Sequence, residues 1–499
     1  MDEFDRRSLL LRGLSVAATA SGWRFVSEAD AASDPRLAGL QRLVKGPVLA
    51  PSNPAYRQAR RIYQERFDDV HPLGVVQPLS VADVRQVIAW SRKTKLAIAI
   101  RSGGHSYGGY STTKGLVVDL RRLNAISLDK TTGLATIGAG ARLIDIESTL
   151  AGSGRAIASG SGATVGIGGL ALGGGIGFAA RKHGTTSDNL ASLGIVTADG
   201  RYRTCSATEN PDLFWACRGG GGGNFGVVTH FSFRTFAAAP VSFFIATWPW
   251  AQAADVLQAW QSFAPQAPDE LFAVCYLRTG PSEPSIECFG QYLGAQSQLG
   301  ALLKPLTDVA GAHLTLGSSP YLDTQMRWAG CSGKTVGQCH LVGETATGTL
   351  PRGNFVAKSD YFNAPLSSAA LTTITQWLEQ AQAAGFGFGS LELDPYGGAI
   401  NRIAADATAF VHRAALFSGQ YLAHPATPSN MTAASSWLQG FYAAMRPFVS
   451  GFAYQNYIDP GLATWKHAYY GSNYARLQKI KTQVDPGSVF RFAQGIPPG

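Results

Sequence analysis

Residues 101–109 read Arg-Ser-Gly-Gly-His-Ser-Tyr-Gly-Gly, and this stretch is the best guide to the fold of the chain. It follows an apolar run, residues 96–100, that has the length and composition of a buried strand, so the glycines begin where a strand ends. Backbone N–H groups in such a loop can bind an anion, and the imidazole of His105 lies among them. Glycine clusters also mark ordinary turns, and a single histidine is more often structural than reactive. This loop alone therefore does not establish chemistry.

A second glycine-rich stretch, residues 159–177, makes a ligand more plausible. Each glycine costs a regular element roughly 0.5–1 kcal/mol relative to alanine, so this density calls for a compensating interaction. A large ligand that the backbone approaches closely, with phosphates held by successive N–H groups, would supply it. The run contains the pattern Gly-x-Gly-x-x-Gly, but it lacks the strand, turn and helix, and the later acidic residue, of a Rossmann fingerprint. The sequence thus favours a large ligand with phosphate groups and does not support a Rossmann fold.

Further motifs follow in a fixed order along the chain. They are Ser187-Asp188-Asn189-Leu190, residues 196–200, residues 214–229, residues 454–460, residues 469–474 and Asp485-Pro486-Gly487. Together with the two glycine-rich stretches, they resemble the berberine bridge enzyme-like oxidases, which are flavoproteins of the vanillyl-alcohol oxidase type. The resemblance implies an α+β fold with a two-subdomain FAD-binding domain of the PCMH type and a substrate domain whose antiparallel β-sheet is covered by helices.

The resemblance also implies that FAD is the cofactor and that His105 bonds covalently to its 8α-methyl carbon. Relatives with a second flavin bond carry a cysteine in a Cys-Pro-x-Val-Gly context, and here Gly162 takes the place of that cysteine. A single linkage is therefore expected. The positions expected to contact FAD are Arg101, Ser102, Gly103, Gly104, His105, Ser106, Gly109, Gly160, Gly162, Thr164, Val165, Gly168, Gly169, Gly173, Gly174, Gly177, Asn189, Val196, Gly226, Val228, Tyr454 and Asn456.

Four positions are expected to carry the chemistry. In the resembling family the residue at the place of Val165 controls access of oxygen to the flavin, and valine is typical of oxidases, which release hydrogen peroxide. Tyr457 matches the tyrosine that takes the substrate proton in several relatives, and a phenol with a pKa near 10 in water needs a partner for this. Glu392 and Asp394 alternate on one face of a predicted strand, and either could activate it. The alternative is that Tyr457 only packs and hydrogen-bonds to the backbone.

Composition excludes some classes of function. The formal net charge is +9, but only 15% of residues are charged and the basic residues form no run longer than a pair. A nucleic-acid site would need a clustered basic face, so we expect no nucleic-acid partner. The six cysteines show no Cys-x-x-Cys pair, so we expect no metal site. The spacings favour bridges Cys275–Cys288 and Cys331–Cys339, with free buried thiols as an equal alternative.

The N-terminus has the character of an export signal. Arg6-Arg7 precede a mildly apolar stretch, residues 13–20, and a small-x-small site at residues 29–31. We expect residues 1–31 to be a twin-arginine signal peptide that delivers the folded protein to the periplasm or the medium, with a disordered basic N-terminus as the alternative. The apolar stretch is too short to span a bilayer, so no stable membrane insertion is expected.

The remaining chain is long enough for more than one domain. We expect an FAD-binding domain at residues 32–237, a substrate-binding domain at residues 238–450, and a segment at residues 451–499 that returns to the FAD domain. Local patterns predict a helix that begins after Ser80, strands at residues 116–120 and 135–138, and a strand at residues 225–236.

The expected function is oxidation of an alcohol or hemiacetal, with a sugar or oligosaccharide as the favoured substrate and oxygen as acceptor. The sequence leaves the oligomeric state open, and a monomer is favoured. An oxidase or oxidative cyclase of an aromatic or polyketide-like metabolite is one alternative. A second alternative is an exported carbohydrate-binding or flavin-binding protein without activity, because a fold alone does not fix function.

Overall fold

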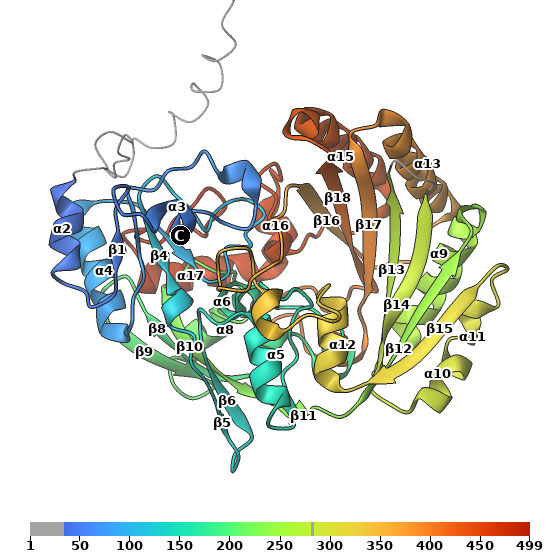
Figure 1. Cartoon of the computed structure of the whole chain (residues 1–499), viewed down its shortest axis with the longest axis horizontal. Coiled ribbons are helices and arrows are strands. Elements are labelled where there is room, and N and C mark those ends of the chain that lie inside the picture. The colour runs from blue at the N-terminus through green and yellow to red at the C-terminus, as the bar shows by residue number, and fades with distance from the viewer. Residues whose placement is uncertain (1–33, 281–283) are drawn as a thin grey trace, which may run out of the picture.

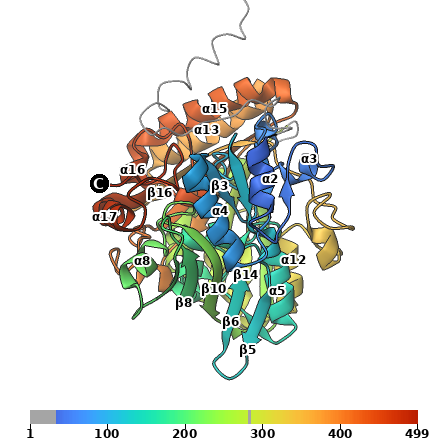
Figure 2. The same cartoon turned by 90° about the vertical axis from the view of Figure 1, so that its left-hand side faces the viewer.

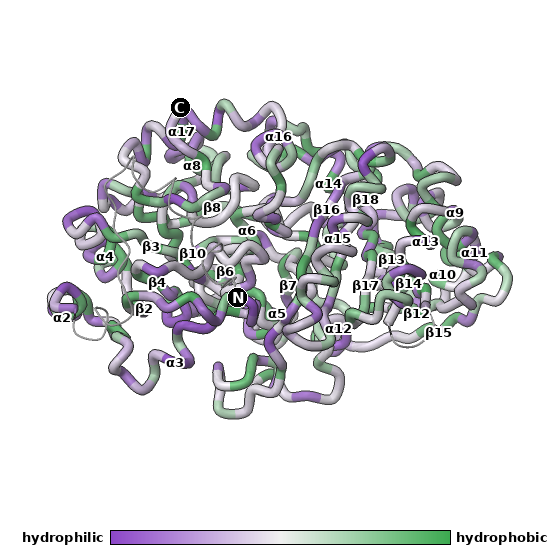
Figure 3. Tube along the Cα trace, turned by 90° about the horizontal axis from the view of Figure 1, so that it is seen from above, coloured by the Kyte–Doolittle hydropathy of each residue, from purple (hydrophilic) through white to green (hydrophobic). Residues whose placement is uncertain are grey.

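The computed structural model describes residues 34–280 and 284–499 and shows two lobes (Figure 1). The first lobe contains two sheets built from residues 48–234, together with the C-terminal helices. The second lobe contains one large sheet built from residues 241–425. Seen from above, the first lobe fills one half of the molecule and strands β12 to β18 fill the other, with α6 near the junction (Figure 3). The α+β fold class that the sequence predicts is confirmed.

The first sheet of the first lobe carries the loop that opens at residue 101. Its strand order is β1 (Val48–Leu49), β2 (Gly74–Val76), β4 (Leu116–Asp119) and β3 (Ile98–Arg101). Strands β2 and β3 both run parallel to β4, so they are buried and apolar, as parallel strands usually are. Helix α4 (Val81–Thr94) begins where expected, because the side chain of Ser80 accepts a hydrogen bond from the N–H of Asp83.

The second sheet of the first lobe is antiparallel. Its order is β5 (Ile126–Asp129), β6 (Leu134–Gly138), β10 (Val227–Arg234), β8 (Leu190–Val196) and β9 (Tyr202–Ser206). The strand expected at residues 225–236 is shorter, since Gly226 has φ of +159° and Phe236 belongs to a separate short strand, β11 (Phe236–Ala237), that pairs with β7 (Arg155–Ala156). Helix α5 (Leu143–Ala151) packs its apolar face into the core of this lobe.

The second lobe contains a seven-stranded antiparallel sheet. Its order is β15 (His313–Ser319), β12 (Val241–Trp248), β14 (Ser285–Tyr292), β13 (Leu271–Thr279), β17 (Gly387–Pro395), β18 (Phe417–Pro425) and β16 (Val356–Phe362). Helices α9 (Ala253–Phe263), α13 (Ser368–Ala384) and α15 (Met431–Met445) cover one face and enclose the apolar core (Figures 1 and 2). The other face packs against the first lobe through Phe272, Val274 and Tyr361.

The C-terminal segment returns to the first lobe, as the resemblance implies. Helices α16 (Trp465–Tyr470) and α17 (Tyr474–Val484) contribute to the core of that lobe. The buried ammonium of Lys481 donates to the carboxylate of Asp485 and to the backbone carbonyls of Asn224 and Phe490. A buried charge requires such partners, so this contact fixes the end of the chain against the glycine-rich segment near residue 224.

Short helices connect the sheets. They are α2 (Pro35–Gln41), α3 (Tyr56–Ala59), α6 (Ile167–Leu172), α7 (Ala180–His183), α8 (Pro211–Ala216), α10 (Gln296–Leu302), α11 (Lys304–Thr307), α12 (Tyr321–Trp328) and α14 (Gly398–Asn401). Among the residues that the structure describes, no helix is long and apolar enough to cross a membrane. The predicted signal peptide lies outside the described residues.

One of the two predicted disulfides forms. Cys331 and Cys339 are bonded, whereas Cys275 and Cys288 are free thiols that face each other across β13 and β14. For this pair, the alternative of free buried thiols is therefore the correct one. Both thiols lie in the apolar core beneath the helices, and burial raises the pKa of Cys288 well above its ordinary value. Disulfide formation needs a thiolate, so this environment favours the free thiol.

Candidate active site

The loop after β3 is held rigidly against α6. The hydroxyl of Ser102 donates to the carbonyl of Ala139 at 2.6 Å and accepts from the N–H of Gly168 at 3.2 Å. A Cβ atom on Gly103 would lie 2.2 Å from the backbone nitrogen of Gly166, so only glycine allows this approach. Gly104 has φ of +77°, which also favours glycine. The sequence of the loop thus brings its backbone against the second glycine-rich stretch.

The same loop presents donors that suit a phosphate ligand. The backbone N–H groups of residues 103–108 find no hydrogen-bond acceptor among residues 34–280 and 284–499. Gly169 is exposed, with no heavy atom within 4 Å of an added Cβ, and a Cβ on Gly222 would lie 3.8 Å from Cα of Gly169. Backbone donors without partners require an acceptor, and the open surface at Gly169 leaves room for one beside the loop. These residues therefore fit the diphosphate of FAD.

The ring of His105 is held between Thr164 and Tyr63. Its Nε2 lies 2.9 Å from the hydroxyl of Thr164, and its ring stacks on Tyr63 with centroids 4.0 Å apart. Burial, assisted by the positive charge of Arg142, lowers the pKa of His105 to about 3. The imidazole is consequently neutral at physiological pH and keeps a lone pair on one ring nitrogen.

Gly162 and Val165 are in direct contact. The N–H of Val165 donates to the carbonyl of Gly162 at 3.2 Å, and a Cβ on Gly162 would lie 2.9 Å from Cγ2 of Val165. A side chain at position 162 would therefore displace the valine. Glycine at 162 and valine at 165 suit each other sterically, and both lie next to Thr164, the partner of His105.

The C-terminal segment reaches the glycine-rich stretch with polar side chains. The amide of Asn456 donates to the carbonyl of Leu170 at 3.0 Å and to the hydroxyl of Tyr454 at 2.9 Å. The hydroxyl of Tyr454 accepts from the N–H of Gly175 at 2.7 Å. Gln455, which sequence reasoning missed, donates to the carbonyls of Gly173 and Gly219. A Cβ on Gly173 would lie 2.0 Å from Oδ1 of Asn456, so a larger residue here would displace this amide from its hydrogen bonds.

Tyr457 lies where the loop and the large sheet meet. Its ring stacks on Tyr107 at 5.5 Å between centroids, and it meets Tyr454 edge-on at 5.0 Å. Burial and the nearby carboxyl group of Asp394 raise the pKa of Tyr457 well above its ordinary value. Tyr107, which immediately follows the quoted His105-Ser106 pair and was not predicted, accepts a hydrogen bond from Gln420 at 2.7 Å.

Glu392 and Asp394 lie on the face of β17 that looks toward the first lobe, since the alternating Leu391 and Leu393 point into the helix-covered core. Glu392 lies opposite Tyr276 on β13 and Gln420 on β18. Burial raises the pKa of Glu392 to about 7, and burial together with the charge of Glu392 raises the pKa of Asp394 well above its ordinary value. The two carboxyl groups share one buried strand face, so ionising both is unfavourable and the pair holds a proton more tightly than exposed carboxyl groups would.

Other residues expected to contact FAD make hydrogen bonds and ion pairs within the protein around the site. Arg101 pairs with Asp119 at 2.9 Å, and its guanidinium also donates to the carbonyl of Ala59. The amide of Asn189 donates to the carbonyls of His183 and Thr185. The remaining positions lie along the glycine-rich turns and strand ends next to these contacts: Ser106, Gly109, Gly160, Gly174, Gly177, Val196, Gly226 and Val228.

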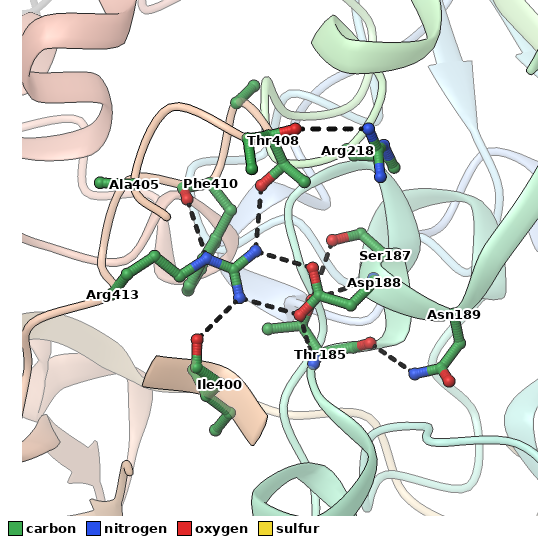
Figure 4. A network of polar contacts seen from close by, with 12 residues as sticks. Thr185, Ser187, Asp188, Asn189, Arg218, Ile400, Ala405, Thr408, Phe410 and Arg413 are labelled. Atoms are coloured by element: carbon green, nitrogen blue, oxygen red, sulfur yellow. Dashed lines mark hydrogen bonds and ion pairs between the residues drawn. The ribbon is translucent and has the colours of Figure 1, made fainter. Parts of the chain in front are cut away.

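A buried ion pair that sequence reasoning missed joins the two lobes. The guanidinium of Arg413 donates to both carboxylate oxygens of Asp188, at 2.7 and 2.8 Å, and both side chains are less than 5% exposed (Figure 4). Asp188 also caps a turn by accepting from the N–H of Thr185. Asp188 belongs to a motif quoted in the sequence, but nothing local marks Arg413 as its partner.

Comparison with known proteins identifies the class of this molecule. Residues 72–206 match the family model described as an FAD binding domain, and residues 453–497 match the model described as berberine and berberine like. The FAD-linked oxidoreductase YgaK of Bacillus subtilis is 34% identical over 91% of this chain and 97% of its own. The protein is thus an FAD-linked oxidoreductase.

Further relatives define the family. The chain is 29% identical to a xylooligosaccharide oxidase of Thermothelomyces thermophilus over 97% of this chain and 98% of that protein. The structure of BBE-like 1 from Physcomitrella patens matches with a TM-score of 0.85 and 30% identity, over 93% of this chain and 99% of that one. The chain belongs to the berberine bridge enzyme-like family, which confirms the resemblance seen in the sequence motifs.

Proposed function

We propose that this oxidase dehydrogenates a hydroxyl or hemiacetal group of a sugar or oligosaccharide and passes the electrons to oxygen, with hydrogen peroxide as the second product. The observation that carries the proposal is the stacking of Tyr457 on Tyr107, two residues from His105, beside the carboxyl groups of Glu392 and Asp394. This arrangement puts proton acceptors next to the expected flavin attachment point.

The chain supplies the proton chemistry. FAD, when bound, accepts the hydride. Tyr457 takes the proton of the substrate hydroxyl, and its own proton passes to Glu392, whose pKa of about 7 makes it a suitable acceptor near neutral pH. Asp394 lies on the same buried face of the sheet, where burial and the proximity of Asp394 and Glu392 raise the pKa of Tyr457. Gln420 holds Tyr107, and hence the face of Tyr457, in place.

The proposal includes a covalent bond between His105 and the flavin and no second bond. The neutral imidazole of His105 has a free lone pair, and its hydrogen bond to Thr164 fixes the ring. Glycine at position 162 offers no nucleophile. The other flavin-lobe thiols, Cys205 and Cys217, are buried, and burial raises their pKa values, which disfavours the thiolate.

Oxygen as acceptor rests on Val165. Its side chain is half-buried beside Gly162 and Thr164, at the point where the resemblance puts the oxygen gate. A sugar substrate is supported by the relatives named xylooligosaccharide oxidase and chitooligosaccharide oxidase. We also propose that the protein is exported through a twin-arginine signal within residues 1–31.

The test is a peroxide-coupled screen of monosaccharides and oligosaccharides against phenolic and alkaloid compounds. We expect peroxide with at least one carbohydrate and none with the aromatic compounds. Turnover of aromatic compounds alone would overturn the substrate class. Substrate reduction of the flavin without peroxide in air would overturn the oxidase assignment.

A further inference from the structure

A small cavity lies beside the loop that carries His105. It is bounded by the end of α3, by the first residues of that loop and by the segment 341–352, which extends from the second lobe. The charged side chains that line it are Arg61, Arg101, Arg121, Arg142, Arg352 and Glu344. Of the positions expected to contact FAD, it shares only Arg101 and Gly103, and it includes none from residues 160–177 or from the C-terminal segment.

The cavity carries excess positive charge. Asp119 pairs with both Arg101, at 2.9 Å, and Arg121, at 2.6 Å. Its single negative charge therefore balances only one of these two positive charges. Glu344 pairs with Arg142 at 2.6 Å, and Asp68 pairs with Arg352 at 2.5 Å. Arg61 forms no ion pair within the part of the chain that the structure describes. Five arginines thus share three carboxylates, and the local charge is about +2, counting each group as fully ionised.

Three residues that line the cavity each have a buried polar atom without a hydrogen-bond partner. These atoms are Nε of Arg61, Nε of Arg101 and Oε2 of Glu344. Burying such atoms without partners is costly, so a ligand that satisfies them is favoured. The two nitrogens need an anionic acceptor. The oxygen of Glu344 needs a donor, because the positive charge of Arg142 lowers the pKa of Glu344 below its ordinary value, against the effect of its burial.

We propose that this cavity binds a free hydrogen phosphate ion. Its charged oxygens accept from Arg61 and Arg101, and its remaining P–OH group donates to Glu344. Sulfate is fully ionised near neutral pH and cannot make the third bond, so the site prefers phosphate. Bound phosphate links the His105 loop of the first lobe to the segment 341–352 of the second lobe.

The experiment is isothermal titration of the flavin-loaded protein with inorganic phosphate and, separately, with sulfate, at pH 7 and constant ionic strength. We expect saturable binding of one phosphate per chain and sulfate binding weaker by roughly tenfold or more, the worth of one charge-assisted hydrogen bond. Absence of saturable phosphate binding, or equal binding of sulfate, would overturn the proposal. Because FAD already fills its own site in the loaded protein, added phosphate cannot bind where the diphosphate of FAD binds.

Two variants locate the site, with a third as control. Arg61→Gln should weaken phosphate binding by roughly tenfold or more. Arg57→Gln removes the same charge from an exposed position on α3 and should leave binding unchanged. Glu344→Gln replaces the carboxylate, which would accept a hydrogen bond from the P–OH group, by an amide that can donate to sulfate as well. The ratio of sulfate to phosphate dissociation constants should therefore fall. Unchanged binding in Arg61→Gln, or an unchanged preference in Glu344→Gln, would contradict the assignment.

Discussion

The assignment of Glu392 as final proton acceptor predicts a specific pH dependence of flavin reduction. Burial raises the pKa of this carboxyl group to about 7, so its active, ionised form increases as pH rises. About 1% is ionised at pH 5 and about 90% at pH 8, and the rate of flavin reduction should therefore rise roughly ninetyfold between these values. In Glu392→Gln the rate should be low and nearly independent of pH.

The assay is anaerobic stopped-flow reduction of the bound flavin by saturating substrate between pH 5 and 8. The matched control is Glu287→Gln. Glu287 on β14 and Glu392 on β17 lie on either side of Tyr276 on β13, each directly opposite it in the strand pairing. Glu287 is thus on the same sheet as Glu392 but two strands away from it. Its variant should keep the wild-type pH midpoint. A wild-type rate that does not change with pH, or a Glu392→Gln variant with the wild-type profile, would refute the role of Glu392.

Three further changes test other parts of the account. Tyr457→Phe should keep the fold and flavin content but slow anaerobic flavin reduction by about 10²–10⁴, and an unimpaired rate would move the base elsewhere. Val165→Leu should slow reoxidation of the reduced protein in air, followed by flavin absorbance, without slowing anaerobic reduction; equal reoxidation rates would remove Val165 from oxygen control. Arg413→Met leaves the buried carboxylate of Asp188 without its cation and should cost about 3–5 kcal/mol in chemical denaturation, whereas Arg476→Met, which breaks the exposed pair with Asp212, should change stability little. Equal effects of these two variants would show that the interlobe pair is not a major contact.

Local sequence patterns predicted much of the framework. Ser80 caps its helix as expected, and the strands before the His105 loop and at residues 116–119 lie where apolar runs indicate. These features depend on neighbouring residues, so a single sequence contains the information. The order of the glycine-rich and C-terminal motifs indicated the family. The family in turn implied that the C-terminal segment returns to the glycine-rich stretch, where Asn456 donates to the carbonyl of Leu170.

Contacts between distant residues could not be predicted in this way. Gln420 and Tyr107 are 313 positions apart, and Arg413 and Asp188 are 225 apart, yet each pair is hydrogen-bonded. No local periodicity relates such residues, since only the packing of the lobes brings them together. The spacing of Cys275 and Cys288 permits a bridge, but their burial in the apolar core, which raises the pKa of the Cys288 thiol, appears only in the folded protein.

The attachment of flavin tests the central claim most directly. The wild-type protein should be denatured and digested, and its flavin-containing peptides identified by mass spectrometry, alongside His105→Ala. We expect one flavin peptide, joined at His105, and complete release of flavin from denatured His105→Ala. A flavin peptide joined at any cysteine, or flavin that remains covalently bound to His105→Ala, would contradict it.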